Sequence, residues 1–190
     1  MRKCIVFGLA AVMVFAAATA YAQGEAKHKF VGAAKCKMCH NTEKQGKIFD
    51  KWMASKHAQA FTSLASEEAK KVATAKGIAD PQKADACLKC HVTGHGAAAE
   101  LLDVKYAAAE GVTCESCHGA GGDYWKNEVM KAVAAGTTKA ADVGLVSKPD
   151  EKSCTKCHNA ESPTFKAFVF KEMWAKIQHG IPAAEPAPTK

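Results

Sequence analysis

The sequence lacks the features that would place it among membrane-spanning proteins or the common enzyme classes. Beyond its first residues, the 190-residue chain contains no run of about twenty uninterrupted apolar residues, which a membrane-spanning helix needs. No Ser/His/Asp set, phosphate-binding loop or pair of catalytic acids is recognisable. No stretch alternates apolar and polar residues in the way that is typical of a β-strand. These absences favour a mainly α protein without a membrane span.

Cysteine, in contrast, occurs in a regular pattern. Eight of the nine cysteines belong to four Cys-x-x-Cys-His motifs. The motif cysteines are Cys36, Cys39, Cys87, Cys90, Cys114, Cys117, Cys154 and Cys157. The histidines that complete the motifs are His40, His91, His118 and His158. Two cysteines three positions apart lie on one side of a helical turn, with the histidine next to them.

The repetition of this motif predicts four covalently bound haem c groups. A single Cys-x-x-Cys pair more often belongs to a zinc knuckle, a redox dithiol or a disulfide. With 8 histidines in 190 residues, chance would place a histidine after all four pairs roughly three times in a million. In c-type haem attachment, the two thiols bond to the haem vinyl groups and the histidine becomes the proximal ligand of the iron.

The N-terminus predicts export from the cytoplasm. Residues 1–22 begin with Met1-Arg2-Lys3, continue with an apolar run over 5–18 and end in Ala20-Tyr21-Ala22, which fits a cleaved signal peptide. Cys4 leaves with this leader, so every cysteine of the mature chain belongs to a haem motif and no disulfide is expected. We therefore expect a periplasmic protein, with the extracellular space as the alternative location.

The mature chain is expected to form one domain built around its cofactors. Without its leader, the 190-residue chain leaves about 42 residues for each haem, which is too few for a large side-chain core. The expected fold is mainly α, a compact multihaem c-type cytochrome with short helices and loops wrapped around four haems in residues 23–180. By the same logic, the apoprotein should not fold. The tail at 181–190 contains three prolines and is expected to be disordered.

The charge of the chain does not support binding of nucleic acids. The formal net charge is +7, or about +5 without the two basic residues of the leader. Each ferric haem with two ionised propionates adds about −1, which brings the holoprotein to roughly +1. The lysines are also spread along the chain rather than clustered. This pattern favours propionate pairing, solubility and weak docking to redox protein partners.

Apolar periodicity and capping signals predict several helices. The first expected helix spans 42–64, and the second is capped by Ser66 and ended by Gly77. The third starts at Asp80-Pro81 and carries the second motif, and the fourth spans 97–110. The fifth runs from Asp123 to Ala135 and is ended by Gly136, and the last runs from Ser162-Pro163 to His179. Residues 93–96 are expected to form a tight turn, and residues 137–149 a loop.

Four histidines lie outside the motifs, one for each iron: His28, His57, His95 and His179. The simplest interpretation is four low-spin haems with two histidine ligands each. His57 falls within the apolar stripe of the first predicted helix. A histidine there is more commonly a core residue, but a helix against a haem face needs one imidazole at such a point, so the ligand role is favoured. His95 is too close to His91 to reach the other face of the same haem, so it should serve a different iron. The alternative soft ligands, whose positions favour a space-filling role, are Met38, Met53, Met130 and Met173.

His28 has three alternative roles. It precedes the first motif histidine by twelve residues, on an arm without a helix signal, so no local feature fixes its side chain. It can ligate an iron of its own chain, ligate an iron of a second copy, or stay unligated. The first role leaves a monomer, the second links copies together, and the third leaves one iron open to small molecules.

Several segments resemble the tetrahaem cytochrome c-554 family. They are Trp52-x-x-Ser55-x-His57-Ala58-x-Ala60, Cys90-His91-Val92-x-Gly94-x-Gly96, the block Gly111-Val112-Thr113-Cys114-Glu115-Ser116-Cys117-His118-Gly119-x-Gly121, and a C-terminal helix that ends in His179. The resemblance covers most of residues 30–180. The third-motif block is also similar to the wider set of multihaem enzymes that includes hydroxylamine oxidoreductase.

This resemblance implies a periplasmic, mainly helical protein with closely packed haem pairs that accepts electrons from a redox enzyme. The family pattern carries over to His57 and His179 as distal ligands. The sequence departs from the pattern at two positions, because known members have an aromatic residue at the position of His95 and a histidine at that of Lys126. The ligand set is therefore rearranged, and the five-coordinate haem of the family is not implied.

Three functional hypotheses follow. The first is an electron carrier, in which closely packed haems pass single electrons between redox protein partners. The second is an enzyme that reduces a nitrogen oxide or a similar small molecule at one open iron. The third is a conducting subunit of a complex or filament, in which His28 ligates a haem of the next copy. The first is favoured, and the oligomeric state stays open.

Overall fold

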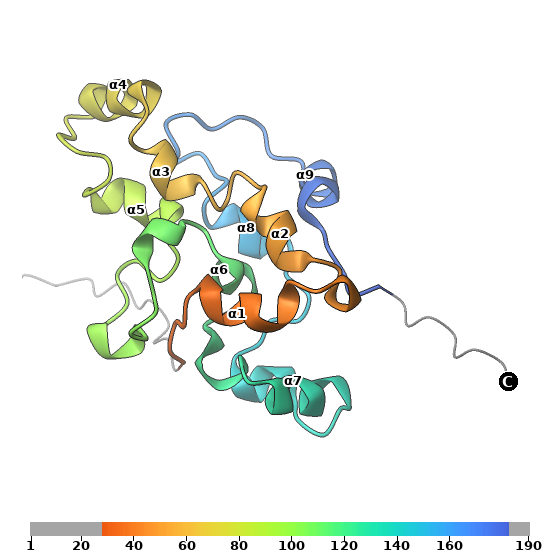
Figure 1. The fold of residues 1–190 in the computed structure, drawn as a ribbon. Coiled ribbons are helices and arrows are strands. Elements are labelled where there is room, and N and C mark those ends of the chain that lie inside the picture. Colours follow the sequence, from red (N-terminus) through yellow and green to blue (C-terminus); the bar gives the residue numbers. More distant parts are fainter. Residues whose placement is uncertain (1–27, 183–190) are drawn as a thin grey trace, which may run out of the picture.

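The computed structural model describes residues 28–182, and the regular secondary structure in this range is helical (Figure 1). The α-helices are α1 (Ala33–His40), α2 (Ile48–Met53), α3 (Ala60–Ser63), α4 (Glu67–Ala75), α5 (Asp85–His91), α6 (Cys114–His118), α7 (Asn127–Ala134), α8 (Glu151–Thr155) and α9 (Phe170–Ile177). The 3-10 helices are η1 (Glu43–Gln45), η2 (Ala99–Leu101), η3 (Ala108–Glu110), η4 (Gly121–Asp123) and η5 (Ala140–Val143). Within residues 28–182, β-type pairing is limited to one isolated bridge between Phe30 and Leu102. The prediction of a mainly α fold is confirmed.

The predicted signal peptide at 1–22 lies outside the described residues, as do residues 183–190 of the predicted tail. The described part of the tail, Ile181 and Pro182, has no regular secondary structure. Among the residues that the structure describes, no helix combines the length and the apolar character required to cross a bilayer.

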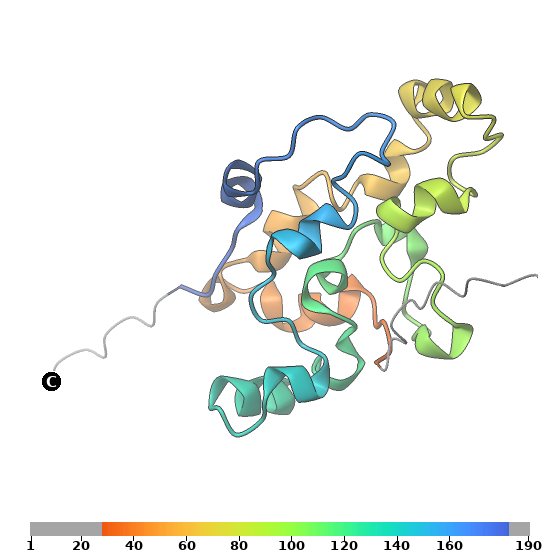
Figure 2. The ribbon, with the colours of Figure 1, turned by 180° about the vertical axis from the view of Figure 1, so that it is seen from behind.

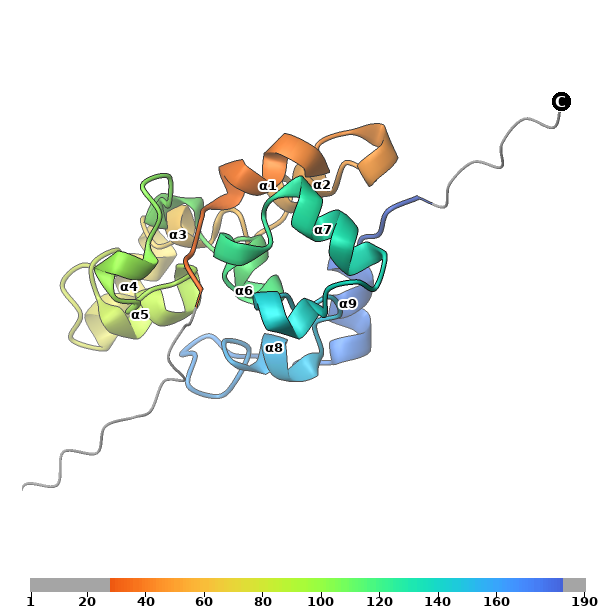
Figure 3. The same cartoon turned by 90° about the horizontal axis from the view of Figure 1, so that it is seen from below.

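The helices that carry the motifs lie close together. α6 carries the third motif and packs against α1, which carries the first motif, and against α8, which carries the start of the fourth. Figure 3 shows α6 between these helices, with α7 and α9 nearby. α5, which carries the second motif, packs against α3 on the side of the molecule that also holds α4 (Figure 2). The order of the motifs in space therefore differs from their order in the sequence.

Local capping signals correctly predict α4 and the end of α7. The Ser66 hydroxyl accepts a hydrogen bond from the backbone N–H of Ala69 at 3.1 Å, as an N-cap does. Gly77 (φ +70°) and Gly136 (φ +74°) follow α4 and α7 in the left-handed conformation that ends helices. The predicted turn at 93–96 is also confirmed.

The prediction of one helix over residues 42–64 is wrong. The segment forms η1, α2 and α3, and a turn over residues 54–59 holds His57. The carbonyl of His57 accepts the backbone N–H of Val112 at 3.0 Å as well as that of Ala60 at 3.1 Å. This long-range hydrogen bond fixes the chain in a turn, although the apolar spacing alone favours a helix.

The helix predicted over residues 97–110 is also wrong, because this segment pairs with the N-terminal part of the described chain. The N–H of Phe30 donates to the carbonyl of Leu101, and the carbonyl of Phe30 accepts the N–H of Asp103, both at 2.8 Å. Backbone groups used in this way are not available for bonds along a helix. Only the single turns η2 and η3 remain.

The helix that carries the second motif starts later than predicted. Asp80-Pro81 is the expected start, but α5 begins at Asp85. The Asp80 carboxylate accepts the backbone N–H of Gln82 at 2.9 Å, which closes a turn instead of capping a helix. The competition between turns and N-caps for aspartate explains the difference.

α7 and α9 also start later than predicted. Asp123, the expected cap of α7, binds His28 instead. The residues after Ser162-Pro163 form a turn and then a segment without regular secondary structure, 165–169, rather than the first turns of α9. In this segment Phe168 stacks on His158, with ring centroids 5.0 Å apart. At both places a side chain that the predicted helix would include contacts a histidine instead.

The buried apolar core of the described chain is small. Its buried apolar residues are Val31, Ala33, Leu64, Ala73, Val92, Ala120 and Tyr124. Large apolar side chains stay exposed instead, including Met38 at 71% and Met53 at 51%. Because hydrophobic stabilisation scales with buried apolar area, a core of this size agrees with the expectation that side chains alone do not form the centre of the protein.

Candidate haem-attachment sites

Two motif histidines are held in the orientation that an iron ligand requires. The Nδ1 atom of His91 lies 2.7 Å from the carbonyl oxygen of Ala60, and that of His118 lies 2.7 Å from the carbonyl oxygen of Val146. A ring that donates its Nδ1 hydrogen to a carbonyl leaves Nε2 free as a ligand and keeps its orientation. Neither partner is recognisable from the sequence, because both act through the backbone.

Two histidines from outside the motifs face motif histidines. The ring centroids of His57 and His158 are 6.0 Å apart, and those of His118 and His179 are also 6.0 Å apart. Two imidazoles on opposite sides of one iron, each with a nitrogen about 2 Å from the metal, have centroids roughly 6 Å apart. Both pairs have the separation that an iron between them requires, so these residues fit a haem.

Burial keeps several of these imidazoles in the form that binds iron. It lowers the pKa of His57, with the neighbouring His158 as the second cause, and it lowers the pKa of His118. It also lowers the pKa of His40, where His118 and His179 add to the effect. A neutral imidazole is the ligand form. The Nδ1 atom of His40 is buried and has no hydrogen-bond partner among the described residues.

Cysteines of different motifs lie next to one another. The pairs are Cys36 with Cys114 from the first and third motifs, Cys117 with Cys154 from the third and fourth, and Cys157 with Cys90 from the fourth and second. In the first pair, the neighbouring Cys114 thiol raises the pKa of Cys36, and Cys36 lowers the pKa of Cys114. All eight motif thiols are free of disulfides. Together with the packing of α6 against α1 and α8, these pairs place the first and fourth motifs beside the third, and the second beside the fourth.

His28 and His95 contact carboxylates rather than motif histidines. The Nδ1 atom of His28 lies 2.6 Å from Oδ2 of Asp123, and the Nε2 atom of His95 lies 3.0 Å from Oδ1 of Asp85. Between residues 28 and 182, no second histidine ring faces either of them. His28 uses Nδ1 for its bond to Asp123, so its Nε2 stays available to a further partner. His95 uses Nε2 for its bond to Asp85, so its Nε2 is occupied.

The segment that carries His57 is fixed to the third-motif block. The indole N–H of Trp52 donates to the carbonyl of Val112 at 2.8 Å, and the N–H of Val112 donates to the carbonyl of His57 at 3.0 Å. Gly111 has a φ of +74°, and a Cβ at this position would lie 2.9 Å from the His57 carbonyl oxygen. This close approach requires glycine. Two of the segments singled out in the sequence therefore contact each other here.

Residues between the cysteines of the third motif connect it to other motifs. Glu115 accepts the backbone N–H groups of Val31 and Gly32, just before α1, each at 2.9 Å. The Ser116 hydroxyl lies 2.6 Å from the hydroxyl of Thr93, which follows the second motif. The motif pattern specifies only its cysteines and histidine. These contacts therefore have no signal in the sequence.

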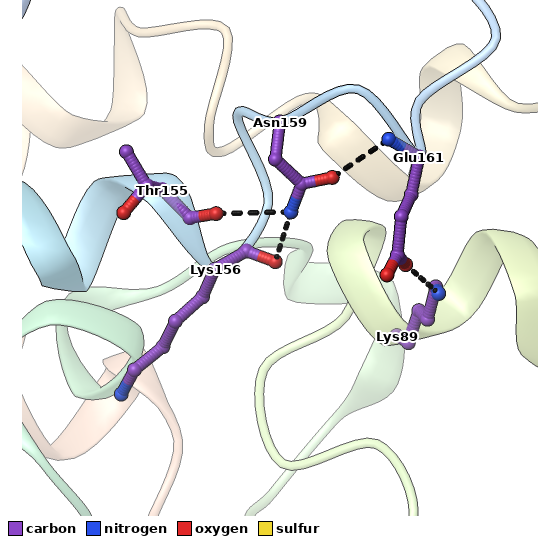
Figure 4. Close-up of polar contacts among 5 residues, drawn as sticks. All are labelled: Lys89, Thr155, Lys156, Asn159 and Glu161. Atoms are coloured by element: carbon purple, nitrogen blue, oxygen red, sulfur yellow. Dashed lines mark hydrogen bonds and ion pairs between the residues drawn. The ribbon is translucent and has the colours of Figure 1, made fainter.

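The second and fourth motifs are connected by a chain of polar contacts (Figure 4). Lys89 donates to Glu161 at 2.6 Å, and the N–H of Glu161 donates to the side-chain oxygen of Asn159 at 2.9 Å. The amide of Asn159 donates to the carbonyls of Thr155 and Lys156 at 2.9 and 3.1 Å. Because the ion pair is exposed, it orients the two motifs more than it stabilises the fold.

Comparison with known proteins identifies the family. The family model for cytochrome c554 and c-prime matches residues 35–119, which contain the first three motifs. Cytochrome c-554 of Nitrosomonas europaea is 30% identical over 178 residues, covering 87% of this chain and 73% of that protein. The chain belongs to the cytochrome c-554 family. No solved structure gives a significant match.

Membership of the cytochrome c-554 family confirms the nature of the cofactor. The chain is a c-type cytochrome that holds covalently bound haem c with its iron, and the role of such a cytochrome is electron transfer with redox partners. The motif cysteines and the facing histidine pairs are the residues that would hold this cofactor. Phe168, which stacks on His158, is an additional neighbour of the fourth motif that sequence analysis missed.

Proposed function

We propose that this cytochrome carries single electrons in the periplasm through four haem c groups, between a redox protein donor and a redox protein acceptor. The observation that carries the proposal is the close placement of the motifs: α6 of the third motif packs against α1 and α8, and Lys89 of the second motif pairs with Glu161, just after the fourth. Neighbouring attachment sites would allow electrons to pass directly from one haem to the next within the protein. The signal peptide predicted at 1–22 supports the periplasmic location.

The proposed ligands of two irons come from the facing histidine pairs. We assign His57 and His158 to one iron, and His118 and His179 to another, because both pairs have the required separation. A haem iron with two histidine ligands changes between the ferric and ferrous states by one electron. Burial lowers the pKa of His57 and His118, so these rings do not need to lose a proton before they ligate.

His28 and His95 stay predicted distal ligands for the irons that have no assigned distal histidine, and His95 is excluded from the iron of the second motif because it lies too close to His91. Asp123 binds Nδ1 of His28 and leaves its Nε2 for an iron, as acidic partners of ligating histidines do. This contact within one chain favours an intramolecular role over a link to a second copy. His95 must release Asp85 from its Nε2 before that atom can bind an iron.

One observation favours a second candidate function. Among the described residues, no histidine ring faces His40 or His91. An iron without a distal protein ligand binds small molecules. Reduction of a nitrogen oxide or a similar small molecule would be the function of such a site.

The test counts haems and distal ligands in the isolated holoprotein. Mass spectrometry is expected to show four haems on a chain that begins at Gln23, and electron paramagnetic resonance to show low-spin ferric haem with little or no high-spin signal. Fewer than four haems would contradict the tetrahaem proposal. A substantial high-spin fraction at neutral pH, together with carbon monoxide binding to the reduced protein, would favour the enzyme.

A further inference from the structure

The carboxylate of Glu115 is buried at the junction of the first and third motifs. The residue is only 3% exposed. Its Oε1 accepts the backbone N–H groups of Val31 at 2.9 Å and Gly121 at 2.7 Å, and its Oε2 accepts that of Gly32 at 2.9 Å. Val31 and Gly32 lead into α1, and Gly121 follows α6. One side chain therefore ties together the helices of two motifs.

The hydrogen bonds of this carboxylate fit its ionised form. Burial raises the pKa of Glu115 and the nearby Glu110 adds to the rise, while the three N–H donors oppose it without cancelling it. Donors that point at the charged form favour it, and both oxygens are acceptors here. Among residues 28–182, no cationic side chain forms an ion pair with Glu115. Its negative charge is therefore not neutralised nearby.

The field of this charge reaches the attachment cysteines. The pKa of Cys36 is raised first by the neighbouring Cys114 thiol and by burial, and the charge of Glu115 raises it further. At Cys114 the neighbouring Cys36 lowers the pKa, and the charge of Glu115 opposes this change. Burial raises the pKa of Tyr124, with a contribution from Glu115. At all three groups the carboxylate disfavours a further negative charge, and the same sign applies to an added electron.

We propose that Glu115 is a positioning residue whose buried charge also lowers the reduction potential of the haems held by the first and third motifs. The inference rests on the proposed function, because it requires haem at both motifs. Reduction there adds one electron from a redox protein donor and takes up no proton. That electron comes close to a carboxylate without a cationic partner, which makes reduction less favourable.

The test is Glu115→Gln in the full holoprotein, followed by a spectroelectrochemical titration. Glutamine keeps one oxygen acceptor and removes the charge. The two transitions that belong to the first and third motifs, assigned by nuclear magnetic resonance of the haem methyl groups, are expected to move to higher potential. The other two are expected to stay close to their original values. A four-haem variant with all four midpoints unchanged, or all four shifted equally, would overturn the inference.

Glu161→Gln is the matched control. It removes the same charge from a carboxylate that is 72% exposed and lies at the second and fourth motifs. Solvent and salt screen such a charge, so the midpoints of the first and third motifs should not respond. A shift of those two midpoints as large as that of Glu115→Gln would contradict a specific effect of Glu115.

A second measurement covers the case in which Glu115→Gln does not assemble. In the unchanged holoprotein, the two midpoints of the first and third motifs should depend less on ionic strength than the other two, because a buried charge is poorly screened. Equal salt dependence of all four midpoints would overturn the inference. Glu115→Asp, which keeps the charge, should keep the original order of midpoints. A wild-type protein with fewer than four haems would instead contradict the proposed function.

Discussion

His57 is the distal histidine whose replacement has the most direct consequence. Its ring faces that of His158 at 6.0 Å. Replacement of His57 by methionine is expected to raise the potential of one haem, because a thioether favours the ferrous state relative to imidazole. A redox titration of the variant beside the wild type measures this change. If no midpoint moves, His57 is not a ligand.

His28→Ala provides the comparison, because His28 contacts Asp123 and no motif histidine. Sedimentation and carbon monoxide binding to the reduced protein separate its three roles. A new carbon monoxide-binding haem with unchanged mass supports ligation within the chain. Loss of oligomers supports a link between copies. Identical behaviour in both assays would leave His28 with the Asp123 contact alone.

The covalent chemistry of haem c makes the motif residues predictable from the sequence, but not their neighbours. The cysteines and histidines of the motifs have fixed spacing, so four repeats are sufficient to recognise them. The pairing of His57 with His158 depends on the tertiary fold, because the two residues are 101 positions apart in the sequence. The carbonyls of Ala60 and Val146 that orient His91 and His118 have no sequence signature, since every residue has a carbonyl.

At the level of elements, the contact between the His57 turn and the third-motif block depends on Gly111. Replacement of Gly111 by alanine would place a Cβ 2.9 Å from the carbonyl oxygen of His57, at a φ of +74°. The turn must then move, so His57 is expected to lose its position opposite His158. The expected result is a high-spin signal from one haem in electron paramagnetic resonance. An unchanged low-spin spectrum would show that the turn tolerates the added atom.

Gly77→Ala is the matched control for this variant. Gly77 has a similar φ of +70°, but a Cβ there would meet no atom within 4 Å. In both variants alanine must adopt a left-handed conformation, which destabilises the folded protein by about 1–2 kcal/mol. The midpoint of thermal unfolding should therefore fall in both. Only Gly111→Ala should change the spin state. A high-spin signal in both variants would point to general destabilisation instead.

The elements that sequence analysis predicts well are those with local determinants. α4 has its N-cap at Ser66 and its terminating glycine at Gly77, and both residues lie within two positions of the ends of the helix in the sequence. The helices predicted over 42–64 and 97–110 are absent because backbone groups there bond to distant segments, at Val112 and at Phe30. Apolar periodicity does not register such bonds, so it overestimates helix in a chain with many long-range backbone contacts.

At the scale of the whole molecule, the small apolar core predicts that the fold depends on haem. Chain produced without haem attachment is expected to lack a cooperative thermal transition, because its buried apolar side chains are few and small. Circular dichroism in the near-ultraviolet and far-ultraviolet ranges, recorded during heating, measures this. The holoprotein, handled identically, is the control. A cooperative transition in the haem-free chain would show that the polypeptide alone forms the core.

The hydrogen bonds of Glu115 also determine when the first motif can become fixed during synthesis. The N–H of Val31 and its acceptor on Glu115 are 84 positions apart. While the ribosome has not yet made the third motif, the N–H groups that lead into α1 have no carboxylate partner. α1 has only 8 residues, and isolated helices of that length are marginal in water. We therefore expect the first motif to stay flexible until the third motif has been synthesised, because the contact with Glu115 that holds it forms only then.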